Sequence, residues 1–182
     1  MDISLLSILF VVLLISFYLV FLYNNMIRAK NQVDEAWAQV DVQLKRRYDL
    51  IPNLIETVKG YASHEASTFE KVTVARTNAI NANDVKSQAQ AENMLTSALK
   101  SIFALSESYP DLKASANFLS LQEELSTTEN KIAFARQYYN DSVYKINTLR
   151  TTIPSMIFKS FAEEREYFQT DDSEREVPKV QF

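Results

Sequence analysis

Residues 33–61 read VDEAWAQVDVQLKRRYDLIPNLIETVKGY, and the spacing of the apolar side chains in this stretch decides the fold class. These side chains fall into two adjacent rows that repeat every seven residues: Trp37, Leu44, Ile51 and Val58 form the first, and Val33, Val40, Leu54 and Tyr61 form the second, with Arg47 as its only polar member. Two such rows are typical of a helix that packs on other helices along its length. The stretch therefore predicts a long helix within a helical bundle.

Pro52 interrupts this stretch, and two interpretations fit it. The repeat continues in phase through the proline, which favours one long, kinked helix. The alternative is a break in which Asp49 caps a new helix and Pro52 lies in its first turn, where proline is tolerated. Gly60 is the only glycine of the chain, and we expect it close to a helix end.

Three further helices are predicted downstream. The second runs from near His64 to Ile80, residues 81–84 form a turn that ends in an N-cap, and residues 109–111 stop the third helix. The predicted inner faces are Phe69, Val72, Ala75 or Arg76, and Ala79 in the second helix; Met94, Leu95, Ala98, Ile102 and Leu105 in the third; and Phe118, Leu125, Ile132, Tyr139, Ile146 and Ile153 in the fourth.

The composition excludes two large fold classes. The chain has one glycine and four prolines among 182 residues. An all-β fold needs frequent turns, and a nucleotide-binding α/β fold needs a glycine-rich phosphate loop, so neither is possible here. Apolar residues make up 47% of the chain, which is enough to build a core. We therefore expect an all-α protein in which a single N-terminal transmembrane helix continues into a long-helix antiparallel bundle of the four-helix type.

Residues 3–22 are free of charge, and as a helix this run is about 30 Å long, which matches the hydrocarbon thickness of a bilayer. A cleaved signal peptide is the alternative, but it would begin with basic residues and have a shorter apolar run. Arg28 and Lys30 follow the run, whereas no basic residue precedes it. The positive-inside rule then places the N-terminus outside and the following domain in the cytoplasm. We expect a single-pass protein of the inner (cytoplasmic) cell membrane, with the lipid bilayer as a partner.

This interpretation divides the chain into three parts. Residues 1–24 are the expected transmembrane anchor, residues 25–168 the cytoplasmic helical bundle, and residues 169–182 an acidic C-terminal tail. Acidic residues far outnumber basic ones between residues 163 and 176, which is typical of a solvated segment.

The side chains that carry most enzyme and metal chemistry are scarce. Cysteine is absent and His64 is the only histidine, so zinc and di-iron sites and a thiol nucleophile are not expected. The net charge of −4 argues against a nucleic-acid partner. We expect no catalytic residues, no cofactor and no metal, and hence a protein that is not an enzyme.

Arg47 is the most informative polar residue, because a basic side chain in an apolar row needs a buried acceptor. Glu129, in a row with Gln122 and Arg136 on the fourth helix, is the expected acceptor. We expect further contacts, either between helices of one bundle or between subunits, from Trp37, Arg46, Tyr48, Pro52, Asn53, Asn130, Arg136, Tyr139 and Asn140. The sequence leaves both of these possibilities open.

Several stretches resemble the LemA family over nearly the whole chain. The most specific is AWAQVDVQLKRRYDLIPNL at residues 36–54, and the others are YPDLK at 109–113, LQEEL at 121–125, TENKI at 128–132 and the ending PKVQF at 178–182. The resemblance implies a bacterial protein with an N-terminal membrane helix and a helical cytoplasmic domain. It implies no particular reaction, and for some members it points to a membrane zinc metalloprotease as a partner.

We therefore expect a non-enzymatic, membrane-anchored helical scaffold that forms a homo-oligomer. The alternative is an adaptor or regulator of a membrane-bound protease. An unrecognised enzyme is a third hypothesis.

Overall fold

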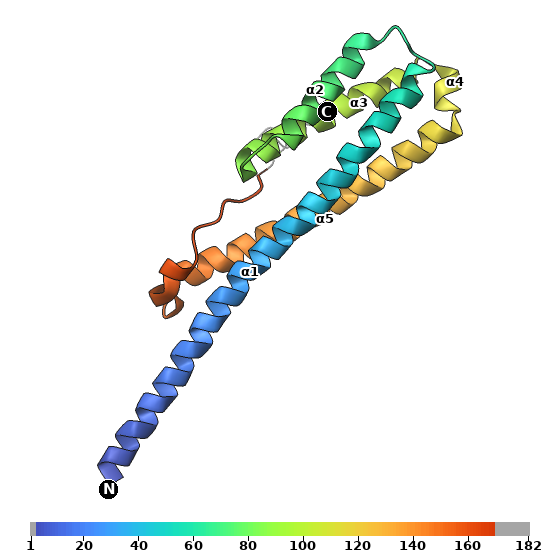
Figure 1. Cartoon of the computed structure of the whole chain (residues 1–182). Coiled ribbons are helices and arrows are strands. Elements are labelled where there is room, and N and C mark those ends of the chain that lie inside the picture. The colour runs from blue at the N-terminus through green and yellow to red at the C-terminus, as the bar shows by residue number, and fades with distance from the viewer. Residues whose placement is uncertain (1–2, 170–182) are drawn as a thin grey trace, which may run out of the picture. The chain divides into compact units, whose positions relative to one another are not determined.

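The computed structural model describes residues 3–169, and these residues form helices and connecting loops with no β-strand (Figure 1). The helices are α1 (Ile3–Lys59), α2 (Ala66–Ile80), α3 (Val85–Ser106), α4 (Pro110–Lys113), α5 (Ala116–Thr151) and the 3₁₀ helix η1 (Ser155–Phe161). The all-α class expected from the sequence is confirmed. Most of the expected acidic tail, residues 170–182, lies outside the described residues.

The described residues divide into two compact units. The first unit contains residues 3–38 and 137–165, and the second contains residues 39–136 and 166–169. The part boundaries expected at residues 24 and 168 remain predictions.

α1 continues as a helix through Pro52, so the alternative of a helix break capped by Asp49 is wrong. Pro52 is exposed, whereas Ile51, Leu54 and Val58 around it are fully buried. The apolar row therefore stays in the core while the proline ring faces solvent. α1 ends at Lys59, directly before the only glycine, as expected.

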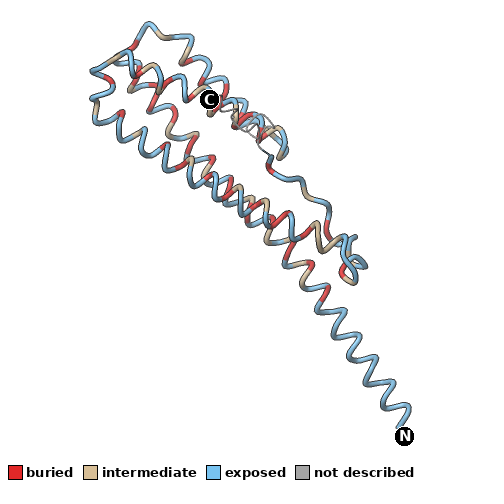
Figure 2. Tube along the Cα trace, turned by 180° about the vertical axis from the view of Figure 1, so that it is seen from behind, coloured by how far each residue is buried: buried red, intermediate tan, exposed pale blue. Residues whose placement is uncertain are grey.

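The core of the second unit draws on all of its helices (Figure 2). α2 buries the four residues expected on its inner face: Phe69, Val72, Ala75 and Ala79. α2 and α3 are joined by a short turn that ends at Asp84, whose side chain accepts a hydrogen bond from the Ser87 backbone and forms a capping box. This hydrogen bond lowers the pKa of the Asp84 carboxyl.

The expectation for the inner face of α3 is wrong at Met94, whereas α3 ends at Ser106, before the expected stop at residues 109–111. Met94 is 59% exposed, whereas Leu95 is buried together with Leu99, one turn further along the helix. The inner face of α3 is therefore rotated from the expected one, because it also accommodates polar side chains described below. The segment at Pro110 does more than stop α3, since proline is suited to the first turn of the short helix α4.

α5 follows its expected heptad row closely. Its members are buried from the first turn nearly to the last: Phe118, Leu125, Ile132, Tyr139 and Ile146. The small residues of the neighbouring row, Thr128, Ala135 and Ser142, are buried as well. Ile153 was expected in this row, but it lies beyond the end of α5 and is 85% exposed.

The first unit contains the apolar N-terminal part of α1. The large apolar side chains of residues 3–21 are all exposed, and burial begins with Leu22 and recurs at Met26, Ala29, Val33 and Ala36. The hydroxyls of Ser7 and Ser16 are satisfied by backbone carbonyls within the same helix. By its length and composition this part of α1 can cross a membrane, as an anchor or as a signal sequence.

Candidate functional site

Arg47 lies at the centre of a buried cluster of polar side chains in the second unit. Its side chain is 3% exposed, and it bridges two acidic residues from two other helices. Arg47 Nη1 lies 3.2 Å from Glu92 Oε2 on α3 and 2.9 Å from Glu129 Oε2 on α5. Arg47 Nη2 donates a 2.7 Å hydrogen bond to Thr96 Oγ1. The guanidinium therefore joins α1, α3 and α5 at one point.

Glu92 is completely buried and accepts hydrogen bonds from a second group of side chains. The Tyr48 hydroxyl donates to Glu92, and Gln88 Nε2 lies 3.1 Å from Glu92 Oε1 and 2.9 Å from the Tyr48 hydroxyl. Burial, reinforced by the hydrogen bond to Glu92, raises the pKa of Tyr48 well above its usual value. Tyr48 is therefore neutral at physiological pH and acts as a hydrogen-bond donor to the carboxylate.

The proline of α1 is compensated by a residue of α2. In a regular helix the carbonyl of Tyr48 would accept a hydrogen bond from the backbone N–H four residues later, but that residue is Pro52, which has none. Arg76 Nε donates a 2.8 Å hydrogen bond to the Tyr48 carbonyl in its place. The gap left by the proline thereby becomes a docking point for α2 on α1.

Arg136 adds a second largely buried guanidinium to the second unit. It stacks on the ring of Phe168, with 4.4 Å from Arg136 Cζ to the ring centroid. Its Nε and Nη2 atoms are buried and have no hydrogen-bond partner among the described residues. Burial lowers the pKa of Arg136, while the nearby carboxylates of Glu92 and Glu129 act in the opposite direction. Two arginines thus face two glutamates, and their charges balance.

A groove of about 320 Å³ opens beside this cluster. Its lining combines charged, amide and apolar side chains of α1, α3 and α5: Arg47, Thr96, Leu99, Lys100, Phe103, Gln122, Leu125, Ser126, Glu129 and Asn130. Among the residues that the structure describes, no cluster of His, Asp and Glu could hold a metal ion. His64 is exposed, unlike the members of the buried cluster. The arrangement suits hydrogen bonding and charge recognition.

The other residues singled out in the sequence lie in several environments. Trp37 and Tyr139 form an edge-to-face ring pair in the first unit, with centroids 5.2 Å apart. In the second unit Arg46 lies 3.9 Å from Glu124, and both side chains are 47% exposed. Of the remaining residues, Pro52, Asn53 and Asn130 are exposed, and Asn140 is half-buried.

Sequence reasoning placed Arg47 opposite Glu129 but missed Glu92, the most deeply buried member of the cluster. Glu92 lies three residues before Leu95 and four after Gln88, so helical spacing puts all three on one face of α3. That spacing was a usable signal. A glutamate on an inner face interrupts the apolar pattern, so the apolar spacing alone does not reveal it.

These features define a class: an all-helical protein whose first helix begins with an apolar segment and whose second unit contains a charged, hydrogen-bonded cluster. Within that class, residues 36–182 match the LemA family, and the chain belongs to this family. It is 30% identical over 137 residues to Protein LemA of Metamycoplasma hominis, covering 73% of this chain. The matched segment covers 63% of that relative, so this chain spans less than two thirds of the relative's length.

Proposed function

We propose that this protein is a non-enzymatic scaffold, anchored in the inner membrane by α1, whose helical units assemble copies side by side. The observation that carries the proposal is the continuity of α1. The apolar stretch with exposed side chains and the part that packs in the units belong to one helix, Ile3–Lys59. A retained anchor explains both features, because a helix in lipid exposes apolar side chains and satisfies its backbone internally.

The proposed orientation places the helical units in the cytoplasm. Arg28 is exposed and Lys30 is half-buried, and both follow the apolar stretch directly. Basic residues beside a membrane helix are retained on the cytoplasmic side. Protease added outside intact cells should therefore spare the chain after residue 30. Digestion of the helical units from outside would reverse the proposed topology, and an N-terminus starting after residue 22 would identify a cleaved signal sequence.

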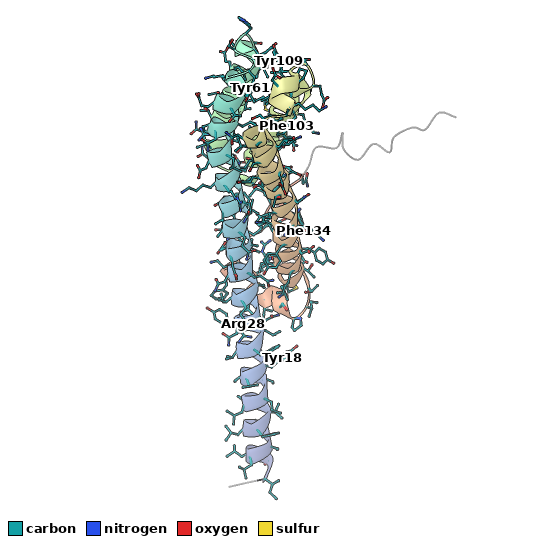
Figure 3. All side chains as sticks on the ribbon, turned by 90° about the vertical axis from the view of Figure 1, so that its right-hand side faces the viewer. Tyr18, Arg28, Tyr61, Phe103, Tyr109 and Phe134 are labelled. Carbon is teal, nitrogen blue, oxygen red and sulfur yellow. The ribbon has the colours of Figure 1, made fainter. Side chains whose placement is uncertain are left out.

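Self-assembly is supported by apolar side chains that remain exposed beyond the apolar stretch. Phe134 on α5 is 73% exposed in the second unit (Figure 3), and Tyr144 is 65% exposed in the first. Tethering to a membrane confines copies to a plane and raises their effective concentration, so weak lateral contacts are sufficient. Copies that use two different surfaces either close into a ring or continue as a filament. We propose the ring, because copies tethered to one membrane all point the same way.

The assembly can be tested by electron microscopy and mass measurement of the full chain in mild detergents and in nanodiscs. We expect a discrete homo-oligomer whose size is reduced by Phe134→Ser. Met94→Ser, which changes an exposed apolar residue of α3, is the matched control and should leave the size unchanged. Monomers in every membrane mimetic would refute the scaffold.

The second candidate function is that of an adaptor or regulator of a membrane-bound protease. The groove beside Arg47 favours it, because its mixed lining could receive side chains of a substrate or partner peptide. Stoichiometric co-purification of a protease with the full chain would support this function. The substitution Lys100→Glu, in the groove lining, should then weaken the complex while a homo-oligomer persists.

A further inference from the structure

Several exposed apolar side chains gather at and before η1 in the first unit. Ile153 is 85% exposed, Ile157 58%, Phe161 50% and Met156 38%. Water disfavours so many large apolar side chains in a short segment, and a contiguous exposed patch of this kind marks a contact surface. The segment 153–161, called the η1 segment below, therefore needs an apolar environment that the unit itself does not supply.

Ring contacts fix the position of the η1 segment along α1. The ring centroid of Tyr23 lies 5.2 Å from that of Phe161 and 5.8 Å from that of Phe158, both in edge-to-face geometry. Figure 3 shows η1 beside α1 close to the labelled Arg28. Tyr23 is the first residue after the apolar run of residues 3–22, and Arg28 is the first charged residue beyond it. If that run spans the hydrocarbon layer, Tyr23 lies at the boundary between acyl chains and headgroups, and the rings of the η1 segment lie there with it.

The chemistry of the η1 segment suits this boundary. Amphipathic aromatic rings such as Tyr23 are favoured at the level of the headgroups, and aliphatic side chains such as Ile157 gain by entering the upper acyl region. Lys159, two residues after Ile157, is exposed and can extend its ammonium group toward lipid phosphates. A protein surface would have to match this mixture by shape, whereas a lipid surface adapts to it.

We propose that the η1 segment is a second membrane contact, which inserts Met156 and Ile157 into the leaflet from which α1 emerges. The proposal rests on the proposed membrane anchor, because the ring contacts with Tyr23 provide continuity between the apolar run and this surface. The first unit would then hold the bilayer at two places, the spanning helix and an interfacial segment. A second copy of the chain is the competing occupant.

The absence of cysteine from the chain allows a direct test by single spin labels. The full-length variants Leu13→Cys, Ile157→Cys and Ala38→Cys are labelled and reconstituted in vesicles of phosphatidylcholine and phosphatidylglycerol in equal parts. Leu13 reports the middle of the apolar run, and exposed Ala38, about 22 Å beyond Tyr23 along α1, is the control in water. We expect the Ile157 label to be several-fold more accessible to oxygen, relative to a water-soluble nickel chelate, than the Ala38 label. The Leu13 label should have the highest ratio.

Each other outcome has a distinct meaning. A Leu13 label that is as accessible to the nickel chelate as Ala38 would refute the anchor, and the η1 proposal with it. A Leu13 label in the acyl region together with an Ile157 label that behaves like Ala38 would refute only the η1 proposal. Spin–spin broadening at Ile157 that disappears on dilution with unlabelled protein would assign the surface to a second copy, and Met156→Cys provides a replacement if Ile157→Cys does not fold.

Discussion

The second unit has one cluster of charged side chains in its core, whereas the charged pairs described in the first unit lie near the surface. Arg47 is 3% exposed and Glu92 is fully buried, while Arg165 and Asp34 of the first unit form a 2.7 Å pair with side chains 34% and 52% exposed. Water screens the exposed pair of Arg165 and Asp34, and it can solvate either residue if the other is lost. It can do neither for the buried pair of Arg47 and Glu92. Equivalent substitutions should therefore have very different costs in the two units.

The largest effect is expected from Arg47→Ala. This substitution leaves Glu92 as a buried carboxylate without its cation, which should lower the free energy of unfolding of the second unit by about 3–5 kcal/mol. Amide hydrogen exchange in α3 of the full chain measures it. The neighbouring substitution Arg46→Ala is the control, because its exposed pair with Glu124 should contribute under about 1 kcal/mol. Equal effects of the two would contradict a stabilising cluster.

Glu129→Ala, alone and combined with Arg47→Ala, measures how much of the stabilisation by Arg47 comes from Glu129 and how much from Glu92. Glu129 is 43% exposed, so its removal should cost less than that of Arg47. The double-mutant cycle should give a coupling of about 1 kcal/mol or more. Additive effects would show that Arg47 depends on Glu92 alone.

Tyr48→Phe should lower the stability of the second unit by about 1.5–3 kcal/mol, since it removes the donor to a buried carboxylate. The substitution should also change how the free energy of unfolding falls at alkaline pH. Because burial raises the folded-state pKa of Tyr48, its contribution is complete below the unfolded-state pKa of about 10 and is lost as the pH rises above that value. Unfolding measured between about pH 9 and pH 11 should therefore show a shallower decline for Tyr48→Phe than for the natural chain.

A smaller effect, about 1–2 kcal/mol, is expected from Arg76→Ala, which leaves the carbonyl of Tyr48 without its donor. Pro52→Ala restores a backbone N–H at the position where a helix supplies that donor. Arg76→Ala should therefore cost less in the Pro52→Ala background, as measured by denaturant unfolding of the four chains. The same cost in both backgrounds would exclude the compensation between the two residues.

The smallest effect is expected in the first unit. Asp34→Asn, which weakens the pair with Arg165, should change its stability by under about 1 kcal/mol, and added salt should reduce the difference further. Hydrogen exchange in residues 22–38 of the full chain measures it. A loss as large as that from Arg47→Ala would remove the contrast between the units.

The parts that the sequence predicted well are those governed by one repeating rule. The row from Phe118 to Ile146 is buried because α5 keeps its heptad repeat over its whole length, and the inner face of α2 follows for the same reason. The apolar helix over residues 3–22 and the helix end close to Gly60 could be predicted equally well. Each of these features depends on residues close together in the chain.

The parts that failed depend on contacts between distant residues. Met94 was expected inside, because the apolar pattern alone does not show that the inner face of α3 is rotated to bring the polar Glu92 toward Arg47 of another helix. The hydrogen bond from Arg76 of α2 to the Tyr48 carbonyl of α1 was not expected either, because the two residues lie 28 positions apart in the chain. Ile153 extends the heptad row of α5 in sequence, but the helix ends before it.

The burial of Arg47 also has a consequence for the order of events during synthesis. Glu92 follows Arg47 by 45 residues, so the ribosome releases the cation long before either of its carboxylates. During that interval the guanidinium has only water to solvate it. The nascent second unit must therefore remain open until α3 and α5 emerge. The ion pairs of Arg47 are therefore among the last contacts of the second unit that can form during synthesis.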